Sequence, residues 1–428
     1  MSDNHKAVIS RIHTRPFPNS DNLVLGLCHG FQVIVGKEVC DGELGIFFME
    51  SLQLSQEYAN ANDLVRRKLP DGTYNKGYFS ENRRCRTIKL RGECSYGYWA
   101  PLTSLAFTNA DLSLLRKGDL LDELNGVKLC QKYFTPATQL ARDSKLRSVK
   151  RGETSYMKKH IDTKQYKRAY ESIPIGATII LTEKIHATSH RVAHSKELRQ
   201  LRWYEKLAKI VGLKIDEYEW KYVTGSRNVI ISDNSGFYSE DFRRKASEFF
   251  EGKLPKGFAV FLEATGFDGE KPIMNRVSTK CLNDKEFTKR YGEEITYSYG
   301  TKPYEVDVWV YRITFTTESG NVVEIPWNLV KEYCKSWNVK HVPEVCEPFI
   351  LKEGELYDCI TGYNDLTKYI ESFTDGPSTI CPEHPREGVC LKYEFGLKWD
   401  ILKNKSFNFL QLEHQSKDED VVDLEEIS

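Results

Sequence analysis

The sequence predicts an α+β chain in which a small antiparallel β-barrel precedes a larger unit of antiparallel sheets with flanking helices. As far as about Gln131, short apolar segments alternate with turn residues, a spacing typical of small barrels. From Ile173 onward, longer alternating strands are separated by segments with helical periodicity. We therefore predict a front domain (1–140), a linker (141–170), a rear domain (171–415) and a tail (416–428).

The front domain begins with three candidate strands, at residues 22–27, 31–35 and 44–48, each bounded by Gly, Asn or Asp. The linker is basic, with ten Lys or Arg against three Asp or Glu over residues 142–168, and we expect a partly helical connector. The tail is acidic, and we expect it to be disordered because such a composition buries little apolar surface.

The rear domain combines predicted helices with apolar strands. Apolar residues at helical spacing predict a helix within 196–211. Ser239 is a good N-cap for a second helix that runs to about Glu251. The residues that set the first helix are Leu198, Leu201, Leu207 and Ile210. The expected strands are at 177–181, 258–263 and 307–315.

The bulk composition is that of an ordinary globular protein, and 61 Lys and Arg balance 61 Asp and Glu. The whole-chain charge therefore predicts no polyanionic partner, and only local patches can bind one. The eleven cysteines show no paired metal-ligand spacing and no signal peptide opens the chain, so we expect reduced thiols in a cytoplasmic protein. No apolar run approaches the roughly 20 residues of a membrane span, so we expect no membrane partner.

Chemistry is indicated first by Lys184, which directly follows an apolar strand in the segment EKIHATSHR (183–191). A lone lysine at a strand end is usually an ordinary surface residue, so the interpretation needs partners. Later segments place an arginine, two glutamates and a lysine pair at the edges of predicted strands, the pair on one face of its strand. These partners are Arg227, Glu263, Glu387, Lys403 and Lys405.

Together these side chains form a chemically coherent set. The Lys184 amine can attack a nucleotide α-phosphate to form a phosphoramidate. Lys403 and Lys405 can neutralise charge on that phosphate and on departing pyrophosphate. Glu263 and Glu387 can position a divalent metal ion, directly or through its waters, or hold the ribose hydroxyls. The metal and the neighbouring lysines would favour a neutral Lys184.

The ordered set resembles the covalent nucleotidyltransferase superfamily of ligases and capping enzymes, over roughly 159–413. EKIHATSHR is similar to its first motif in the EKIHG form typical of RNA ligases, Glu263 to motif III, REGVCLK (386–392) to motif IV and LKNKS (402–406) to motif V. KHIDT (159–163) and IPIG (173–176) resemble the lead-in of the Deinococcus-type RNA ligase family, also called RNA ligase 5. SRN (226–228) resembles a segment of RNA ligase 2-like enzymes whose arginine contacts the phosphate.

The resemblance implies that Lys184 is the catalytic nucleophile and that Glu263 and Glu387 hold metal. Ala187 departs from the pattern, because the motif has glycine there, but alanine is the smallest change available and we expect it to be tolerated. Tyr311, where related enzymes place an aromatic before Asp, can stack on adenine or can pack in the core, and the sequence leaves both open. The histidine at the position of His186 in this motif usually contacts the residues around the nucleotide rather than the nucleotide itself. The nucleotide-binding residues implied are Glu183, His186, Arg227, Glu263, Tyr311, Glu387, Lys403 and Lys405.

In the front domain, PNSDNL (18–23) and IKLRGECSYG (88–97) resemble OB-type tRNA-binding modules, a fold also expected at the front of Deinococcus-type RNA ligases. Five cations within nine residues can follow a phosphate backbone on an OB-like barrel, or can simply guard a solvated edge strand. Strand alternation sends them to both faces, so they cannot all contact one ligand. They are Arg83, Arg84, Arg86, Lys89 and Arg91.

The resemblance therefore implies a monomeric, ATP-dependent RNA ligase that repairs RNA by joining 3′-hydroxyl and 5′-phosphate ends through lysyl-AMP. It would use ATP with Mg²⁺ or Mn²⁺ on RNA or an RNA/DNA nicked duplex. Domain order agrees, because DNA ligases and capping enzymes place an OB domain after motif V and only about twenty residues follow Lys405. Two alternatives remain: a GTP-using capping-type nucleotidyltransferase, and a non-catalytic RNA-binding protein with a decayed ligase domain, at which Ala187 hints.

Overall fold

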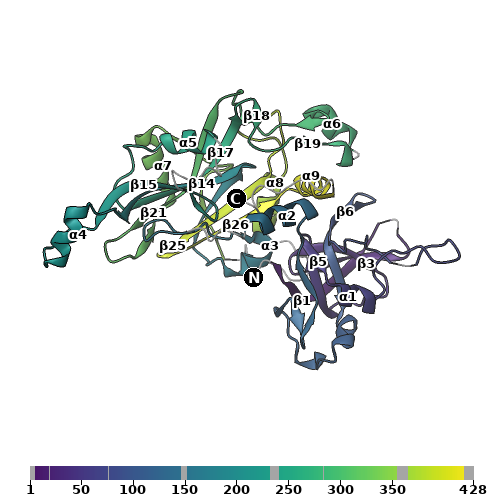
Figure 1. Cartoon of the computed structure of the whole chain (residues 1–428). Coiled ribbons are helices and arrows are strands. Elements are labelled where there is room, and N and C mark those ends of the chain that lie inside the picture. The colour runs from purple at the N-terminus through teal and green to yellow at the C-terminus, as the bar shows by residue number, and fades with distance from the viewer. Residues whose placement is uncertain are drawn as a thin grey trace.

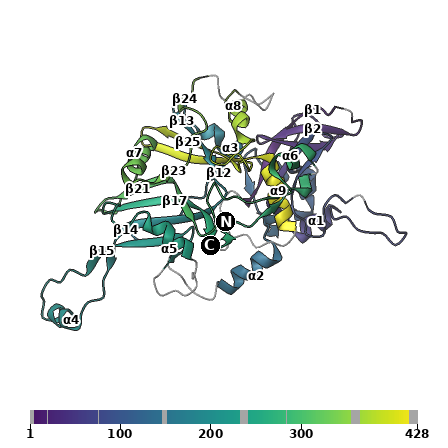
Figure 2. The same ribbon diagram turned by 90° about the horizontal axis from the view of Figure 1, so that it is seen from above.

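The computed structural model describes residues 5–18, 20–75, 77–145, 152–231, 241–282, 284–353 and 365–418. It has the predicted α+β architecture with several antiparallel sheets. In Figure 1, an N-terminal unit coloured purple to blue lies beside a larger unit coloured teal to yellow. The last described helix, α9 (Phe407–Asp418), lies where the two units meet, as Figure 2 also shows from above.

The N-terminal unit is built on one antiparallel sheet with the strand order β3-β2-β1-β4-β7-β6, and β8 pairs with β1. The predicted strands at 22–27, 31–35 and 44–48 are confirmed as β2, β3 and β4. The sheet curls, and the Ile34 amide donates to Ser95 Oγ on β7 at 3.1 Å. Among the described strands no pairing joins β3 to β6, so the closed barrel predicted here is not found.

Both faces of this sheet are packed, which explains the uninterrupted apolar run in β4. Phe47 faces a core with Ile12 and Trp99, whereas its neighbour Phe48 faces a second core with Tyr58. The strands are β1 (Ala7–Pro16), β2 (Leu23–Cys28), β3 (Phe31–Gly36), β4 (Leu44–Met49), β5 (Leu52–Leu54), β6 (Thr87–Leu90), β7 (Glu93–Pro101), β8 (Leu120–Leu121), β9 (Glu123–Leu124), β10 (Val127–Lys128) and β11 (Cys130–Lys132). The helices are α1 (Gln56–Ala61), η2 (Leu102–Thr108) and η3 (Leu112–Leu114).

The connector is partly helical, as predicted. Helix α2 (Pro136–Lys145) runs across the boundary that we placed at residue 140, and α3 (Tyr166–Ala169) and η4 (Tyr170–Ser172) precede the larger unit. Lys167 is buried and pairs with Glu371 at 3.0 Å, and Arg168 Nη2 donates to the carbonyl of Lys6 at 3.2 Å. The end of the connector is therefore packed between the two units.

The larger unit contains two main sheets. One has the order β12-β26-β25-β13-β24, and the other runs β16-β15-β14-β17-β21-β22 with β18 and β23 at its sides. The strands predicted at 177–181, 258–263 and 307–315 are confirmed within β13, β17 and β21. The strands of the first sheet are β12 (Lys164–Gln165), β13 (Thr178–Lys184), β24 (Phe349–Ile350), β25 (Gly388–Phe395) and β26 (Lys398–Lys405). The others are β14 (Thr188–Leu198), β15 (Tyr218–Ser226), β16 (Ile230–Ile231), β17 (Phe258–Asp268), β18 (Lys271–Pro272), β19 (Val277–Ser278), β20 (Glu294–Ile295), β21 (Val306–Thr316), β22 (Val322–Glu324) and β23 (Lys340–His341).

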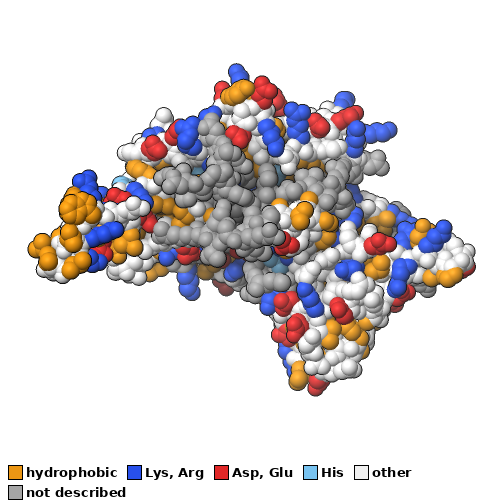
Figure 3. Space-filling view, in the orientation of Figure 1, with side chains coloured by type: hydrophobic (Ala, Val, Ile, Leu, Met, Phe, Trp, Pro, Cys, Tyr) orange, Lys and Arg blue, Asp and Glu red, His pale blue; other side chains and the backbone are white. Residues whose placement is uncertain are grey.

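Most helices of this unit pack on the sheets, but α4 does not. The helix predicted within 196–211 is only partly right, because β14 continues to Leu198 and α4 spans only Trp203–Ile210. This helix sits at the tip of the β14–β15 hairpin and exposes apolar side chains, Ile210 by 80% (Figure 3). The other helices are α5 (Asp241–Glu248), η5 (Lys280–Leu282), α6 (Lys285–Tyr291), α7 (Trp327–Trp337) and α8 (Asp365–Thr374).

Two expectations fall on residues that lie outside the described ranges. These are the Ser239 N-cap and the disordered state of the acidic tail beyond Asp418. The helix that Ser239 was expected to begin is confirmed as α5. No helix in the described part of the chain is long and apolar enough to cross a bilayer.

Candidate active site

Strands β13 and β26, which flank β25, bring three lysines to one pocket. In the register of the first sheet, Lys184 on β13 lies opposite Gly388 on β25, which lies opposite Lys405 on β26. One pleat further along, Cys390 lies opposite Lys403. Because side chains two residues apart share a face, all these groups project the same way. They line a pocket that is open to solvent at its mouth.

Gly388 is the residue that lets the flanking strands' lysines converge. Its φ is +151°, and a Cβ at this position would lie 2.2 Å from the carbonyl oxygen of Asn404. A larger residue would therefore displace β26 and with it Lys405. The glycine of the REGVCLK segment has a local structural reason in this sheet.

Glu387 is the carboxylate on which these lysines converge. Its side chain is 1% exposed, and its Oε1 lies 2.7 Å from Lys184 Nζ and 3.3 Å from Lys405 Nζ. Its Oε2 lies 3.8 Å from His186 Nδ1. A buried carboxylate needs such cations, because an isolated buried charge is strongly unfavourable. Glu387 thus fixes the position of the Lys184 amine relative to Lys405.

The neighbours of Lys184 in the EKIHATSHR segment are held by contacts with the surrounding protein. Glu183 points to the other face of β13, where its Oε2 accepts from Thr379 N at 2.7 Å and Thr379 Oγ1 at 2.6 Å. The His186 amide donates to Tyr299 Oη at 2.7 Å. Ala187 is fully buried in the core and has no positive φ, so no glycine conformation is required there.

The second sheet forms the opposite wall of the pocket. Glu263 on β17 lies opposite Ser189 on β14, and Ser189 Oγ donates to Glu263 Oε1 at 3.0 Å. On β21 the register shifts at Tyr311, because Phe261 pairs with Arg312 and the next residue pairs with Val310. This bulge turns Tyr311 into the pocket lining together with Arg312. Burial raises the pKa of the Tyr311 phenol well above its usual range, so it is neutral at pH 7.

The KHIDT and SRN segments meet at the pocket. Arg227 follows β15 directly, and its Nη2 lies 3.4 Å from Asp162 Oδ1. The His160 ring is tilted against the Tyr311 ring, with ring centroids 5.6 Å apart. Arg191 was not predicted as a site residue and has a structural role: its buried guanidinium donates to the carbonyls of Ser226, Lys158 and Gly152. It anchors both segments to β14.

The far end of the pocket from Lys184 contains groups that sequence reasoning missed. Trp327 lies at the start of α7, and its amide donates to Glu394 Oε1 at 2.8 Å. Arg312 pairs with Glu324 at 2.8 Å, and Lys392 pairs with Glu394 at 3.0 Å. These contacts join residues far apart in the chain, so no local pattern signals them, although Lys392 stands inside the REGVCLK segment.

Two shifted pKa values bear on which group is the nucleophile. Burial raises the pKa of Cys390 to about 11, so the pocket's thiol is protonated at pH 7 and is a poor nucleophile. Burial and the cations Lys405 and Lys184 lower the pKa of Lys403 to about 8, so this lysine is mostly charged at pH 7. The protonated Cys390 thiol is therefore a poor candidate for the nucleophile, and Lys403 acts as a cation at pH 7.

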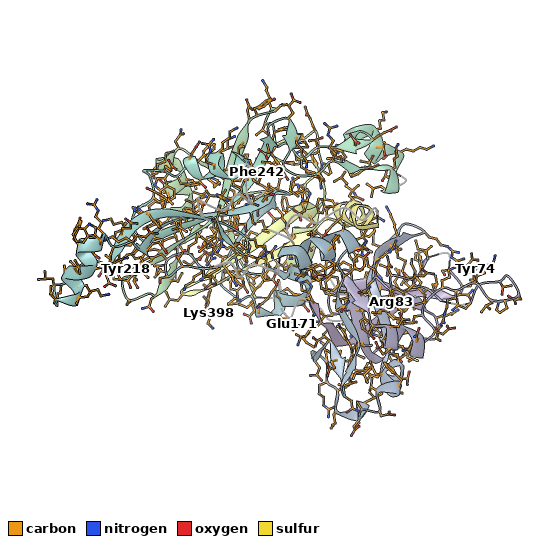
Figure 4. All side chains as sticks on the ribbon, viewed as in Figure 1. Tyr74, Arg83, Glu171, Tyr218, Phe242 and Lys398 are labelled. Carbon is orange, nitrogen blue, oxygen red and sulfur yellow. The ribbon has the colours of Figure 1, made fainter. Side chains whose placement is uncertain are left out.

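The five cations of the N-terminal unit do not share one surface. Arg84 is 2% exposed, and its Nη1 donates to the carbonyl of His414 on α9 at 3.3 Å. Arg83, labelled in Figure 4, donates to the Leu54 carbonyl at 3.1 Å. Arg86 is half-buried, whereas Lys89 and Arg91 are exposed, and Arg91 with Gly92 forms the tight turn between β6 and β7. Of these five described side chains, Lys89 and Arg91 are the exposed ones.

The protein supplies only some of the ligands that a divalent metal ion needs at this site. Glu263 lines the pocket from the second sheet, Glu387 lies next to Lys184 just before β25, and no group of three or more His, Cys, Asp or Glu able to hold a metal exists in the described residues. Mg²⁺ and Mn²⁺ are commonly held by one or two carboxylates, with waters and substrate phosphates as the other ligands. The residues present fit that mode and do not form a closed protein cage.

No protein family and no curated protein matches the chain in sequence. Among solved structures, the chain is similar to a mutant of Naegleria gruberi RNA ligase with AMP and Mn, at a TM-score of 0.61 and 17% identity, over 95% of this chain and 98% of that chain. A mutant of the same ligase with ATP and Mn gives 0.60 and 16%, over 95% and 98%, and the ligase with pyrophosphate gives 0.60 and 15%, over 97% and 100%. At these identities the likeness establishes the fold: the chain has the fold of this RNA ligase across nearly its whole length.

Proposed function

We propose that the chain is an ATP-dependent RNA ligase that joins a 3′-hydroxyl to a 5′-phosphate through AMP carried on Lys184. The observation that carries the proposal is that β13 and β26, on either side of β25, bring Lys184, Lys403 and Lys405 to one pocket, where Lys184 and Lys405 pair with the buried carboxylate of Glu387. The solved neighbours are RNA ligases with ATP, AMP or pyrophosphate, which supports nucleotidyl transfer at a general level.

In the first step, Lys184 Nζ attacks the α-phosphorus of ATP. The N–P bond forms as the bond from that phosphorus to the bridging oxygen breaks, and pyrophosphate leaves. Lys184 must first lose a proton, and Glu387 Oε1, at 2.7 Å, is placed to accept it. Lys403 and Lys405 neutralise charge on the phosphates, so the step depends on positioning and electrostatics more than on a strong base.

Glu263 and Glu387 would hold Mg²⁺ or Mn²⁺ through carboxylate oxygens and waters. When bound, the ion would neutralise charge on the triphosphate. Tyr311 and Trp327 line the pocket away from Lys184 and offer aromatic faces to the adenine. Arg227, near the same pocket, would hold a phosphate of the nucleotide.

In the later steps, AMP passes from Lys184 to the 5′-phosphate end, and a 3′-hydroxyl then attacks that activated phosphate and releases AMP. The N-terminal unit would act as the OB-like module that grips the nucleic acid. Exposed Lys89 and Arg91 are the cations of this unit that we assign to the phosphate backbone, and buried Arg84 is not among them.

A sealing assay tests this function. A 5′-labelled nicked duplex, with RNA or DNA as the bridging strand, is incubated with ATP or GTP and Mg²⁺ or Mn²⁺, and products are separated on a denaturing gel. We expect sealing with ATP by the wild type and by Lys398→Ala, an exposed lysine on the same sheet, and none by Lys184→Ala. Failure of the wild type to seal any RNA-containing nick, or equal sealing by Lys184→Ala, would refute the proposal.

A further inference from the structure

Helix α9 begins two residues after Lys405 and is fixed to the candidate active site at its first turn. Ser406 Oγ accepts from the amide of Phe409 at 3.0 Å, which caps the helix. The Ser406 amide donates to the carbonyl of Glu387 at 2.9 Å. The helix therefore cannot move far without disturbing the ends of β25 and β26.

One face of α9 touches the residues around Lys184. Phe409 and Glu413 are four residues apart and share this face. The Phe409 ring lies 4.8 Å from the His186 ring and 5.3 Å from Lys405 Nζ. Glu413 Oε2 lies 2.8 Å from Lys405 Nζ, and the two side chains are only 23% and 17% exposed. Such a partly buried charge-assisted contact restricts a side chain with four rotatable bonds.

The opposite face of α9 is held by the N-terminal unit. The Phe407 ring packs against Tyr96 on β7 with centroids 5.5 Å apart. At the other end, the carbonyl of His414 accepts from Arg84 Nη1 at 3.3 Å, and its Nδ1 accepts from the amide of Thr87 at 3.4 Å. The N-terminal unit thus contacts the helix near both described ends of this face.

Lys184 and Lys405 compete for the same oxygen, Oε1 of Glu387. Because Glu413 holds Lys405 at the shorter distance, 2.8 Å against 3.3 Å, it leaves Glu387 as the closer partner of Lys184. Without the Glu413 carboxylate, Lys405 would shift toward Glu387 and away from a bound phosphate.

We propose that Glu413 is a positioning residue for Lys405, and that α9 couples Arg84 of the N-terminal unit to this lysine. The inference rests on the proposed function and deepens it. The N-terminal unit then contributes to lysine adenylylation itself, before any nucleic acid is bound, through a helix rather than through contact with the nucleotide.

The test is single-turnover adenylylation by rapid quench with α-labelled ATP at a series of concentrations. We expect Glu413→Gln to lower the maximal rate about tenfold, the effect of losing one charge-assisted hydrogen bond, with a smaller rise in the apparent KM for ATP. Glu413→Asp, which keeps the carboxylate, should recover part of the rate, and exposed Glu332→Gln on α7 should match the wild type. Melting temperatures of all variants exclude a general loss of folding.

The outcomes separate the inference from the function on which it rests. No label on wild-type protein would refute both. Normal labelling of the wild type with Glu413→Gln within twofold of it, or with Glu413→Asp no better than Glu413→Gln, would refute the positioning role alone.

A double-mutant cycle tests the coupling through α9. We expect Arg84→Met to slow adenylylation at saturating ATP, and Arg84→Met with Glu413→Gln to be no slower than Glu413→Gln alone, because both changes act on Lys405. Independent, multiplying effects would overturn the coupling. If Arg84→Met does not fold, Phe407→Leu at the Tyr96 contact takes its place in the same cycle.

Discussion

Replacing Glu387 with glutamine removes one charge and almost no volume from the centre of the pocket. The carboxylate is 1% exposed and lies 2.7 Å and 3.3 Å from the ammonium groups of Lys184 and Lys405. In Glu387→Gln, these two lysines and Lys403 lie close together without a compensating negative charge. No carboxylate remains at 2.7 Å to accept the proton from Lys184.

The size of the effect follows from these two contacts. A hydrogen bond to a charged group contributes about 1.5–3 kcal/mol, and removing one partner of a buried pair costs about 3–5 kcal/mol. Both lysines are 17% exposed, and solvent screens part of the loss, so we take about 3 kcal/mol. At one decade per about 1.4 kcal/mol, adenylylation of Glu387→Gln should be slower by roughly 150-fold.

The assay is the rate of label transfer from α-labelled ATP to protein at pH 7, with Glu332→Gln as the charge-matched control. Pyrophosphate binding, measured by calorimetry, should be kept or strengthened because the pocket becomes more positive. A Glu387→Gln rate within threefold of the wild type would refute the assignment of Glu387 as the group that holds Lys184, as would an equal loss in Glu332→Gln.

Three further predictions follow from the pKa values and the pocket walls. Burial raises the pKa of Glu50 from 4.5 to about 7, so the free energy of unfolding should fall by up to about 3 kcal/mol as pH rises from about 4.5 through 7. Glu50→Gln should remove that pH dependence in thermal unfolding at pH 5 and pH 8, and an unchanged profile would contradict it. Lys403, with a pKa of about 8, is charged below that pH, so the pyrophosphate affinity measured by calorimetry should fall as pH rises from 8 to 10. Lys403→Arg, which stays charged, should reduce this fall. The same pH dependence of affinity in the wild type and in Lys403→Arg would be evidence against a role for this lysine. Tyr311→Ala should weaken ATP binding by about 1 kcal/mol while Tyr311→Phe stays near the wild type, and equal losses would point to the hydroxyl instead of the ring.

Local patterns in the sequence were sufficient for the lysine set. Period-two alternation predicts that Lys403 and Lys405 share a face of one strand, and the structure has them on the pocket face of β26. That Lys184 lies two strands away in register with Lys405 depends on β25 between them, and only motif order, not local chemistry, indicated that neighbourhood.

Long-range packing was out of reach of the same reasoning. The count of cations around Arg84 predicts a nucleic-acid contact, yet this side chain is buried against α9, whose His414 lies 330 residues away in the chain. The helix expected within 196–211 failed in its first part because Lys196 and Leu198 pair with β15, so tertiary pairing outweighed the apolar spacing. Trp327 lines the pocket from α7, and Glu324 on β22 pairs with the pocket residue Arg312; no local pattern signals either contact.

Whether Lys184 itself carries the nucleotide can be decided by peptide mass spectrometry of the protein after incubation with ATP or GTP and a divalent metal ion, alongside the protein as isolated. We predict a mass increase of one AMP on the peptide that contains Lys184, formed from ATP and absent in Lys184→Ala. An adduct on a different residue, an adduct from GTP alone, or an unmodified peptide in every sample would contradict the proposed chemistry.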